Sequence, residues 1–132
     1  MELPVVVGLH VCERVTEDRA VGNATIWNRF TQLASDRFPS LGFDFTVFAL
    51  FIDGDGTLAF RVEIERLGTG ELVHEFPTAI PFEDRLIETP FHLKLSGVTF
   101  PEPGGYEVSL TIEDEPIARC RIQLFEIHGA GI

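Results

Sequence analysis

Two aspartates in a glycine-rich turn are the residues whose types and spacing most resemble a metal site. Asp53 and Asp55 alternate with glycine in Asp53-Gly-Asp-Gly56, as at the start of a calcium-binding loop. A complete loop needs further oxygen ligands and a bidentate glutamate about seven residues later. The next acids, Glu63 and Glu65, instead fall on the polar side of an alternating strand. Because aspartate and glycine are also common in tight turns, we interpret the segment as a structural turn, with calcium as the alternative.

Histidines and cysteines offer a second possible ligand set. His10 and Cys12 share one face of a predicted strand and could meet Cys120 from the last strand. A buried cluster is the competing interpretation, because a fourth ligand is missing and no histidine pair has the spacing of a zinc site. First and last strands of a sandwich can be neighbours, so a Cys12–Cys120 disulfide is conceivable, but a cytosolic compartment would keep both thiols reduced. The four histidines are His10, His74, His92 and His128.

The sequence shows no pattern typical of an enzyme. There is no Gly-x-Ser-x-Gly nucleophile motif, and no glycine-rich loop precedes a helix to bind phosphate. Acids surround Arg85 in a connecting segment at Glu83, Asp84 and Glu88, which we interpret as a solvated loop rather than a general acid-base pair. We therefore predict a non-enzymatic protein with no catalytic, cofactor-binding or metal-binding residues.

Alternating apolar and polar residues predict the elements that would position these side chains. Three strands near the C-terminus show the alternation clearly, and Tyr106 opens the penultimate one, as in the tyrosine corner of immunoglobulin-like domains. We predict a single all-β domain over residues 1–132, an immunoglobulin-like antiparallel sandwich of about seven or eight strands. The predicted strands cover residues 5–12, 24–27, 45–52, 58–65, 71–80, 91–95, 106–113 and 118–124.

Turn signals and prolines refine this prediction. The strands at 45–52 and 58–65 are expected to form a hairpin around the Asp53–Gly56 turn. Pro77 and Pro81 predict an edge strand or a bulged strand, because proline donates no ladder hydrogen bond. At most a short helical turn is expected near residues 30–37, ended by Phe38-Pro39.

Charge and composition exclude several partners. The 132 residues carry 21 acidic and 10 basic side chains, a net charge of -11, which repels nucleic acid and anionic membranes. The N-terminus lacks the positive charge of a secretory signal, and the longest apolar run is about half of the roughly 20 residues that a membrane span needs. We expect a soluble cytoplasmic protein.

Several short motifs resemble those of one family. They are Leu9-His-Val-Cys12, Gly22 before a short strand, Phe38-Pro39, Asp53-Gly-Asp-Gly56 and, most specifically, Phe100-Pro-Glu-Pro-Gly-Gly-Tyr-Glu-Val-Ser-Leu110. The chain resembles small uncharacterised bacterial proteins that share a domain of unknown function, and the resemblance covers almost all of it. It implies a β-sandwich fold and implies no activity.

One strand is apolar on both faces. Along Phe43 to Ile52 only Asp44 interrupts the apolar faces, although an isolated sandwich buries one face of a strand. The outer face must be covered by residues 29–41, by a second copy or by a partner. We therefore predict an interaction or structural module, a homo-oligomer or a binder of another protein; the alternative is a small-molecule-binding or metal-binding sandwich. Trp27 and Phe30 could anchor a partner, but we interpret them as core or loop-pinning aromatics.

Overall fold

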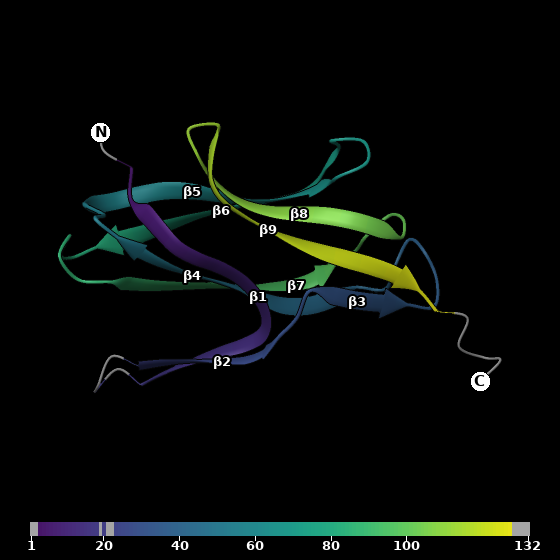
Figure 1. Ribbon diagram of the computed structural model, residues 1–132, viewed down its shortest axis with the longest axis horizontal. Helices are drawn as coiled ribbons and strands as arrows, with labels where there is room; N and C mark the ends of the chain where they lie inside the picture. The colour runs from purple at the N-terminus through teal and green to yellow at the C-terminus, as the bar shows by residue number, and fades with distance from the viewer. Residues whose placement is uncertain (1–2, 19, 21–22, 128–132) are drawn as a thin grey trace.

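The computed structural model describes residues 3–18, 20 and 23–127, which form two β-sheets packed face to face (Figure 1). Sheet A has the strand order β2-β1-β4-β7, and sheet B has the order β3-β9-β8-β5-β6. The strands are β1 (Val5–Asp18), β2 (Asn23–Arg29), β3 (Gln32–Ser35), β4 (Phe43–Ile52), β5 (Gly56–Arg66), β6 (Leu72–Phe82), β7 (Thr89–Val98), β8 (Gly104–Ile112) and β9 (Glu115–Glu126). The all-β sandwich prediction is therefore confirmed.

The core lies between the two sheets and is rich in phenylalanine. Phe51 of β4 sits at its centre, with ring contacts to Phe60 and Phe82 of sheet B and to Phe91 of sheet A. The residues that alternate toward this core are the apolar positions read from the sequence, because side chains on a strand point to opposite faces in turn. Burial of these large aromatic side chains is the main force that holds the sheets together.

Tyr106 joins the core to the connection that enters β8. Its ring is fully buried against Phe100 at 4.9 Å between ring centres, and its hydroxyl donates to the Glu102 carbonyl at 2.6 Å. A tyrosine that bonds back to the preceding backbone in this way is the tyrosine corner of immunoglobulin-like sandwiches. The Pro-Glu-Pro-Gly-Gly segment thus crosses from sheet A to sheet B with its backbone secured by one side chain.

The predicted hairpin around the Asp53–Gly56 turn was wrong. β4 and β5 belong to different sheets, so this turn links the sheets and closes no hairpin. The cause of the error is that pairing between distant segments decides which strands are neighbours, and local propensity is only a weak guide to it. The described residues contain no helix and form nine strands, one more than the upper end of the expected number. The additional strand is β3, Gln32–Ser35, which lies where at most a helical turn was expected and pairs with β9 in parallel.

The prediction of an edge strand is confirmed. β6, which contains Pro77 and Pro81, is an edge strand of sheet B and pairs in antiparallel register with β5. In the part of the chain that the structure describes, no helix is long and apolar enough to cross a membrane.

The outer face of β4 is covered by the protein's own β1–β2 hairpin. β1 pairs with β4 up to Cys12, then continues as a long arm with β2 along the outer side of sheet A (Figure 1). Near the end of this arm, Glu17 Oε1 lies 3.5 Å from Nε2 of His92, the β7 residue directly opposite Phe48 of β4. Phe48 is accordingly only 3 % exposed, although it lies outside the core cluster between the sheets. The cover that Phe48 requires is therefore intramolecular, and of the segment 29–41 Arg29 belongs to the covering hairpin.

Candidate functional site

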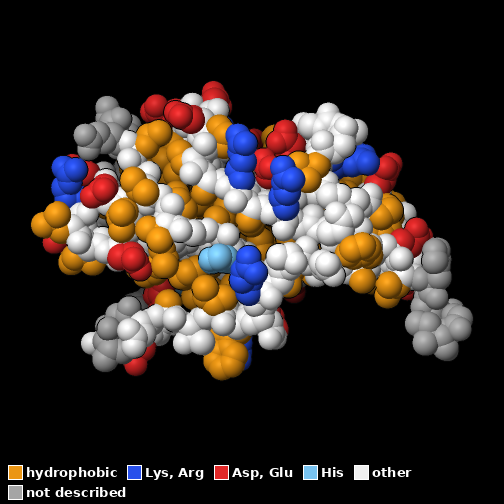
Figure 2. Space-filling model, viewed as in Figure 1, with side chains coloured by type: hydrophobic (Ala, Val, Ile, Leu, Met, Phe, Trp, Pro, Cys, Tyr) orange, Lys and Arg blue, Asp and Glu red, His pale blue; other side chains and the backbone are white. Residues whose placement is uncertain are grey.

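Large apolar side chains are exposed at one end of the sandwich. Leu86 and Ile87 lie in the β6–β7 connection and are 87 % and 63 % exposed, while Val5 and Val7 of β1 are about half exposed. The backbone brings them to the same end, because Val5 pairs with Ile52 and the next residue, Asp53, donates its amide to the Arg85 carbonyl. We call Val5, Val7, Leu86 and Ile87 the end patch; hydrophobic side chains gather at the left of Figure 2, where β1 begins.

A small hollow adjoins the end patch. It has a volume of about 330 Å³ and is lined by Pro81, Ile87 and Pro90 together with three acids, Glu83, Asp84 and Glu88. Asp84 shapes the loop beside it, since its carboxylate accepts from the Leu86 amide at 2.9 Å and its carbonyl accepts from the Ile87 amide at 3.1 Å. Asp84 thus has a turn-forming role, and the loop presents an apolar tip within an acidic rim.

The two aspartates of the glycine-rich turn are exposed and serve its geometry. Asp53 adopts a left-handed conformation with φ of 60°, which aspartate tolerates better than most residues. Gly54 has no alternative, because a Cβ there would lie 2.2 Å from Cδ1 of Phe82. Within the described ranges, no group of three or more histidine, cysteine or acidic side chains could hold a metal ion. The turn residues are explained by the crossing between sheets.

His10 and Cys12 share the outer face of β1 but make different contacts. The Nδ1 atom of His10 accepts a hydrogen bond from Arg29 Nε at 3.0 Å, and burial followed by the charge of Arg29 lowers the pKa of His10. The Cys12 thiol is fully buried and donates to the carbonyls of Arg14 and Thr46, both at 3.6 Å. Burial raises its pKa. The two side chains therefore fill strand positions rather than converge on a shared centre.

Cys120 lies on β9, and both cysteines are free thiols. Burial is the main cause that raises the pKa of Cys120 to about 11, with Arg29 acting in the opposite direction. A thiol with such a pKa is almost entirely protonated at neutral pH, so it is a poor nucleophile. Of the other histidines, His74 bonds the Thr99 carbonyl and His128 lies outside the described residues.

The two aromatic residues considered as anchors have separate roles. Trp27 is exposed on the β1–β2 arm, where its indole Nε1 donates to Thr16 Oγ1 at 3.0 Å and the Arg14 guanidinium stacks on its ring at 4.7 Å. Phe30 packs edge-on against Phe45 at the border of the core, 6.0 Å between ring centres. Trp27 thus braces the arm, and Phe30 pins the segment that follows it.

The sequence interpretation missed the end patch. Its signal was present as Leu86-Ile87, two large apolar residues inside an acidic connection, but an apolar pair in a loop can equally fold inward. Only the exposure of the side chains distinguishes the two cases.

The chain belongs to the DUF6941 family, a family of unknown function, whose sequence profile matches residues 8–125. No curated protein matches the sequence. Among solved structures, the chain is similar to a β-glucosidase from Listeria innocua, with a TM-score of 0.43 and 14% identity over 72% of this chain and 14% of that one. The same enzyme in complex with isofagomine gives 0.43 and 14% over 73% and 15%. The chain spans about one seventh of that enzyme's length, and the likeness carries no argument about activity.

Proposed function

We propose that this protein is a non-enzymatic interaction module that binds another protein molecule through the end patch. The observation that carries the proposal is the exposure of Leu86, which is 87 %, beside the half-apolar hollow that Ile87 lines. Exposed apolar side chains that gather beside a hollow commonly mark a contact surface, because their burial against a partner is favourable. A partner side chain could fill the hollow while Leu86 enters a pocket on the partner.

Charge favours one kind of partner. Glu83, Asp84 and Glu88 rim the hollow, and the net charge of the chain is -11. Like charges facing each other across an interface are unfavourable, so these acids support a partner with an apolar anchor and a basic rim over a second copy of this chain. Self-association is the second form of the proposal, and co-purification combined with light scattering separates the two.

The non-enzymatic character is supported by what the candidate side chains contact. Asp84 accepts hydrogen bonds from its own turn, and His10 is held by Arg29. We also propose that the protein acts in a bacterial cytoplasm, where the thiols of Cys12 and Cys120 would stay reduced.

Co-purification with matched variants tests the proposal. The tagged full chain, Leu86→Asp and the control Leu41→Asp are compared; Leu41 is 57 % exposed in the β3–β4 connection. We expect the same partner with the wild type and Leu41→Asp, and its loss with Leu86→Asp. Light scattering on the same three proteins detects self-association, which Leu86→Asp should abolish. Partners and oligomeric state that are identical in all three proteins would overturn the proposal.

A further inference from the structure

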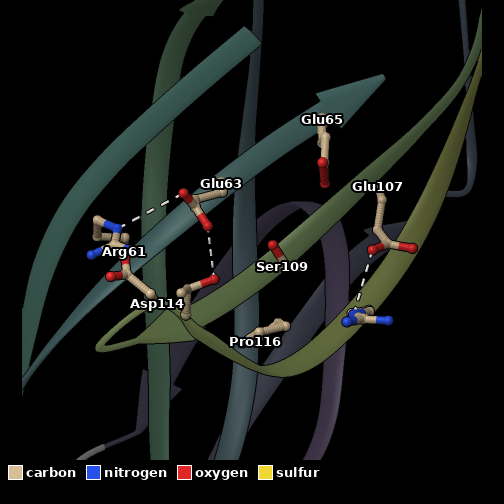
Figure 3. A pocket seen from close by; sticks show the side chains of 9 residues that line it. Arg61, Glu63, Glu65, Glu107, Ser109, Asp114 and Pro116 are labelled. Atoms are coloured by element: carbon tan, nitrogen blue, oxygen red, sulfur yellow. Dashed lines mark hydrogen bonds and ion pairs between the residues drawn. The ribbon is translucent and has the colours of Figure 1, made fainter. Parts of the chain in front are cut away.

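The outer face of sheet B carries a polar groove whose lining residues differ from those of the end patch. Three strands contribute facing pairs: Glu63 of β5 lies opposite Ser109 of β8, and Glu65 lies opposite Glu107 (Figure 3). On the other side of β8, Arg119 of β9 faces Ser109. The groove has a volume of about 330 Å³, and its lining includes these five side chains.

The floor of the groove is more buried than its place on an outer face suggests. Ser109 and Thr111 are 7 % and 3 % exposed, because β8 is flanked by β5 and β9 and the longer side chains of both strands rise beside it. Two short hydroxyl side chains between longer charged ones leave the open space.

One wall of the groove is internally satisfied. Thr111 Oγ1 donates to Glu63 Oε1 at 2.9 Å, and Glu63 Oε2 lies 3.8 Å from Arg61 Nε. Arg61 also donates from Nη2 to Asp114 Oδ1 at 2.8 Å. These groups form a connected set of donors and acceptors around Arg61, so they need no further partner.

The opposite wall contains hydrogen-bond acceptors that make no hydrogen bond within the described part of the chain. The carboxylate of Glu65 makes no hydrogen bond or ion pair with any other described residue. Glu65 stands directly across from Glu107, although like charges in a cross-strand pair are destabilising. The carboxylate of Glu107 lies 3.5 Å from Arg119 Nε through Oε1 and 3.6 Å from Arg121 Nε through Oε2. Both distances are longer than those of charge-assisted hydrogen bonds. The Ser109 hydroxyl points into the groove (Figure 3) and has no hydrogen-bond partner among the described residues.

We propose that this groove binds an alkylguanidinium or alkylammonium group. Its N–H groups would donate to the carboxylates of Glu65 and Glu107 and to the Ser109 hydroxyl, three acceptors around one open space. A cation between Glu65 and Glu107 removes the repulsion of that pair. A metal ion fits less well, because the described residues contain no group of three or more suitable ligands. The inference is independent of the proposed function, since the groove and the end patch share no residue.

Calorimetric titration of the full chain tests the proposal with three probes. Agmatine represents a small molecule that carries both a guanidinium and an ammonium group. N-acetyl-arginine amide represents the arginine side chain of a protein, and N-acetyl-citrulline amide is its uncharged analogue. We expect saturable binding of at least one cationic probe, which identifies the source of the group, and no binding of the citrulline analogue. Absence of saturable binding for both cationic probes, or equal binding of the citrulline analogue, would overturn the proposal.

Variants locate the site. Glu65→Gln should weaken binding about tenfold and Ser109→Ala a few-fold, the effects expected for losing a charged and a neutral acceptor. Glu71→Gln makes the same change of charge at an exposed residue outside the groove lining and should leave affinity unchanged. Far-ultraviolet circular dichroism verifies that each variant is folded. Equal weakening by Glu71→Gln and Glu65→Gln would mean diffuse attraction to an acidic protein and would also refute the site.

Discussion

The two outer faces of the sandwich differ in their exposure to solvent, because the chain covers one of them and leaves the other open. The outer face of sheet A carries Phe48, and the β1–β2 arm covers this face, so that Phe48 is only 3 % exposed. The outer face of sheet B carries charged and hydroxyl side chains, and it stays open as a groove (Figure 3). A strand that is apolar on both faces therefore need not indicate a partner, because a long hairpin of the same chain can cover its outer face. Candidate binding surfaces are then those that the chain leaves uncovered.

Truncation of Phe48 should give the largest effect. Because its ring is buried beneath the arm, Phe48→Ala is expected to lower the free energy of unfolding by about 3–5 kcal/mol. Phe125→Ala makes the same chemical change at an exposed position of β9 and should cost less than about 1 kcal/mol. Urea denaturation measures both. A loss for Phe48→Ala no larger than that for Phe125→Ala would show that the arm does not cover sheet A in solution.

One buried threonine on each outer face makes a different hydrogen bond. Thr46 on the covered face and Thr111 on the open face are each 3 % exposed. Thr111 donates to the Glu63 carboxylate at 2.9 Å, whereas Thr46 donates to the Glu13 carbonyl at 3.5 Å. We expect Thr111→Val to cost about 1–2 kcal/mol, because a carboxylate loses its donor, and Thr46→Val to be nearly neutral. Chemical denaturation that ranks the two variants in the reverse order would contradict this assignment.

The smallest expected effect is a pH dependence of stability caused by His10, which lies beside the arm. Burial and Arg29 lower the pKa of His10 in the folded state, so the unfolded chain, with a pKa of about 6.5, binds the proton more readily. The contribution of His10 to stability is therefore fully present above about pH 6.5 and is lost as the pH falls below it. Urea midpoints at about pH 7.5 and about pH 5.5 should differ more in the wild type than in His10→Gln. Equal differences would remove His10 as the cause.

Much of the fold could be predicted from local sequence. Alternation identified the core sides of β5, β8 and β9, and Tyr106 with its preceding glycines indicated the tyrosine corner. The prolines placed β6 at an edge. These features depend on neighbours in the chain, and side-chain periodicity reports them directly.

The candidate surfaces could not be predicted in the same way. The groove depends on Glu65 of β5 meeting Glu107 of β8, and that register joins residues that are far apart in the chain. The end patch depends on Leu86 facing outward from a connection. Neither the pairing partner nor the direction of a loop side chain has a local sequence signal.

An acidic all-β protein follows from the amino-acid sequence without any tertiary information, because composition and alternation act through each residue's own solvation and strand preference. Three features depend on tertiary packing: the Asp53–Gly56 turn joins two sheets, the arm covers Phe48 and a polar groove stays open. They follow from the packing of distant strands, because the burial of shared surface outweighs local preference.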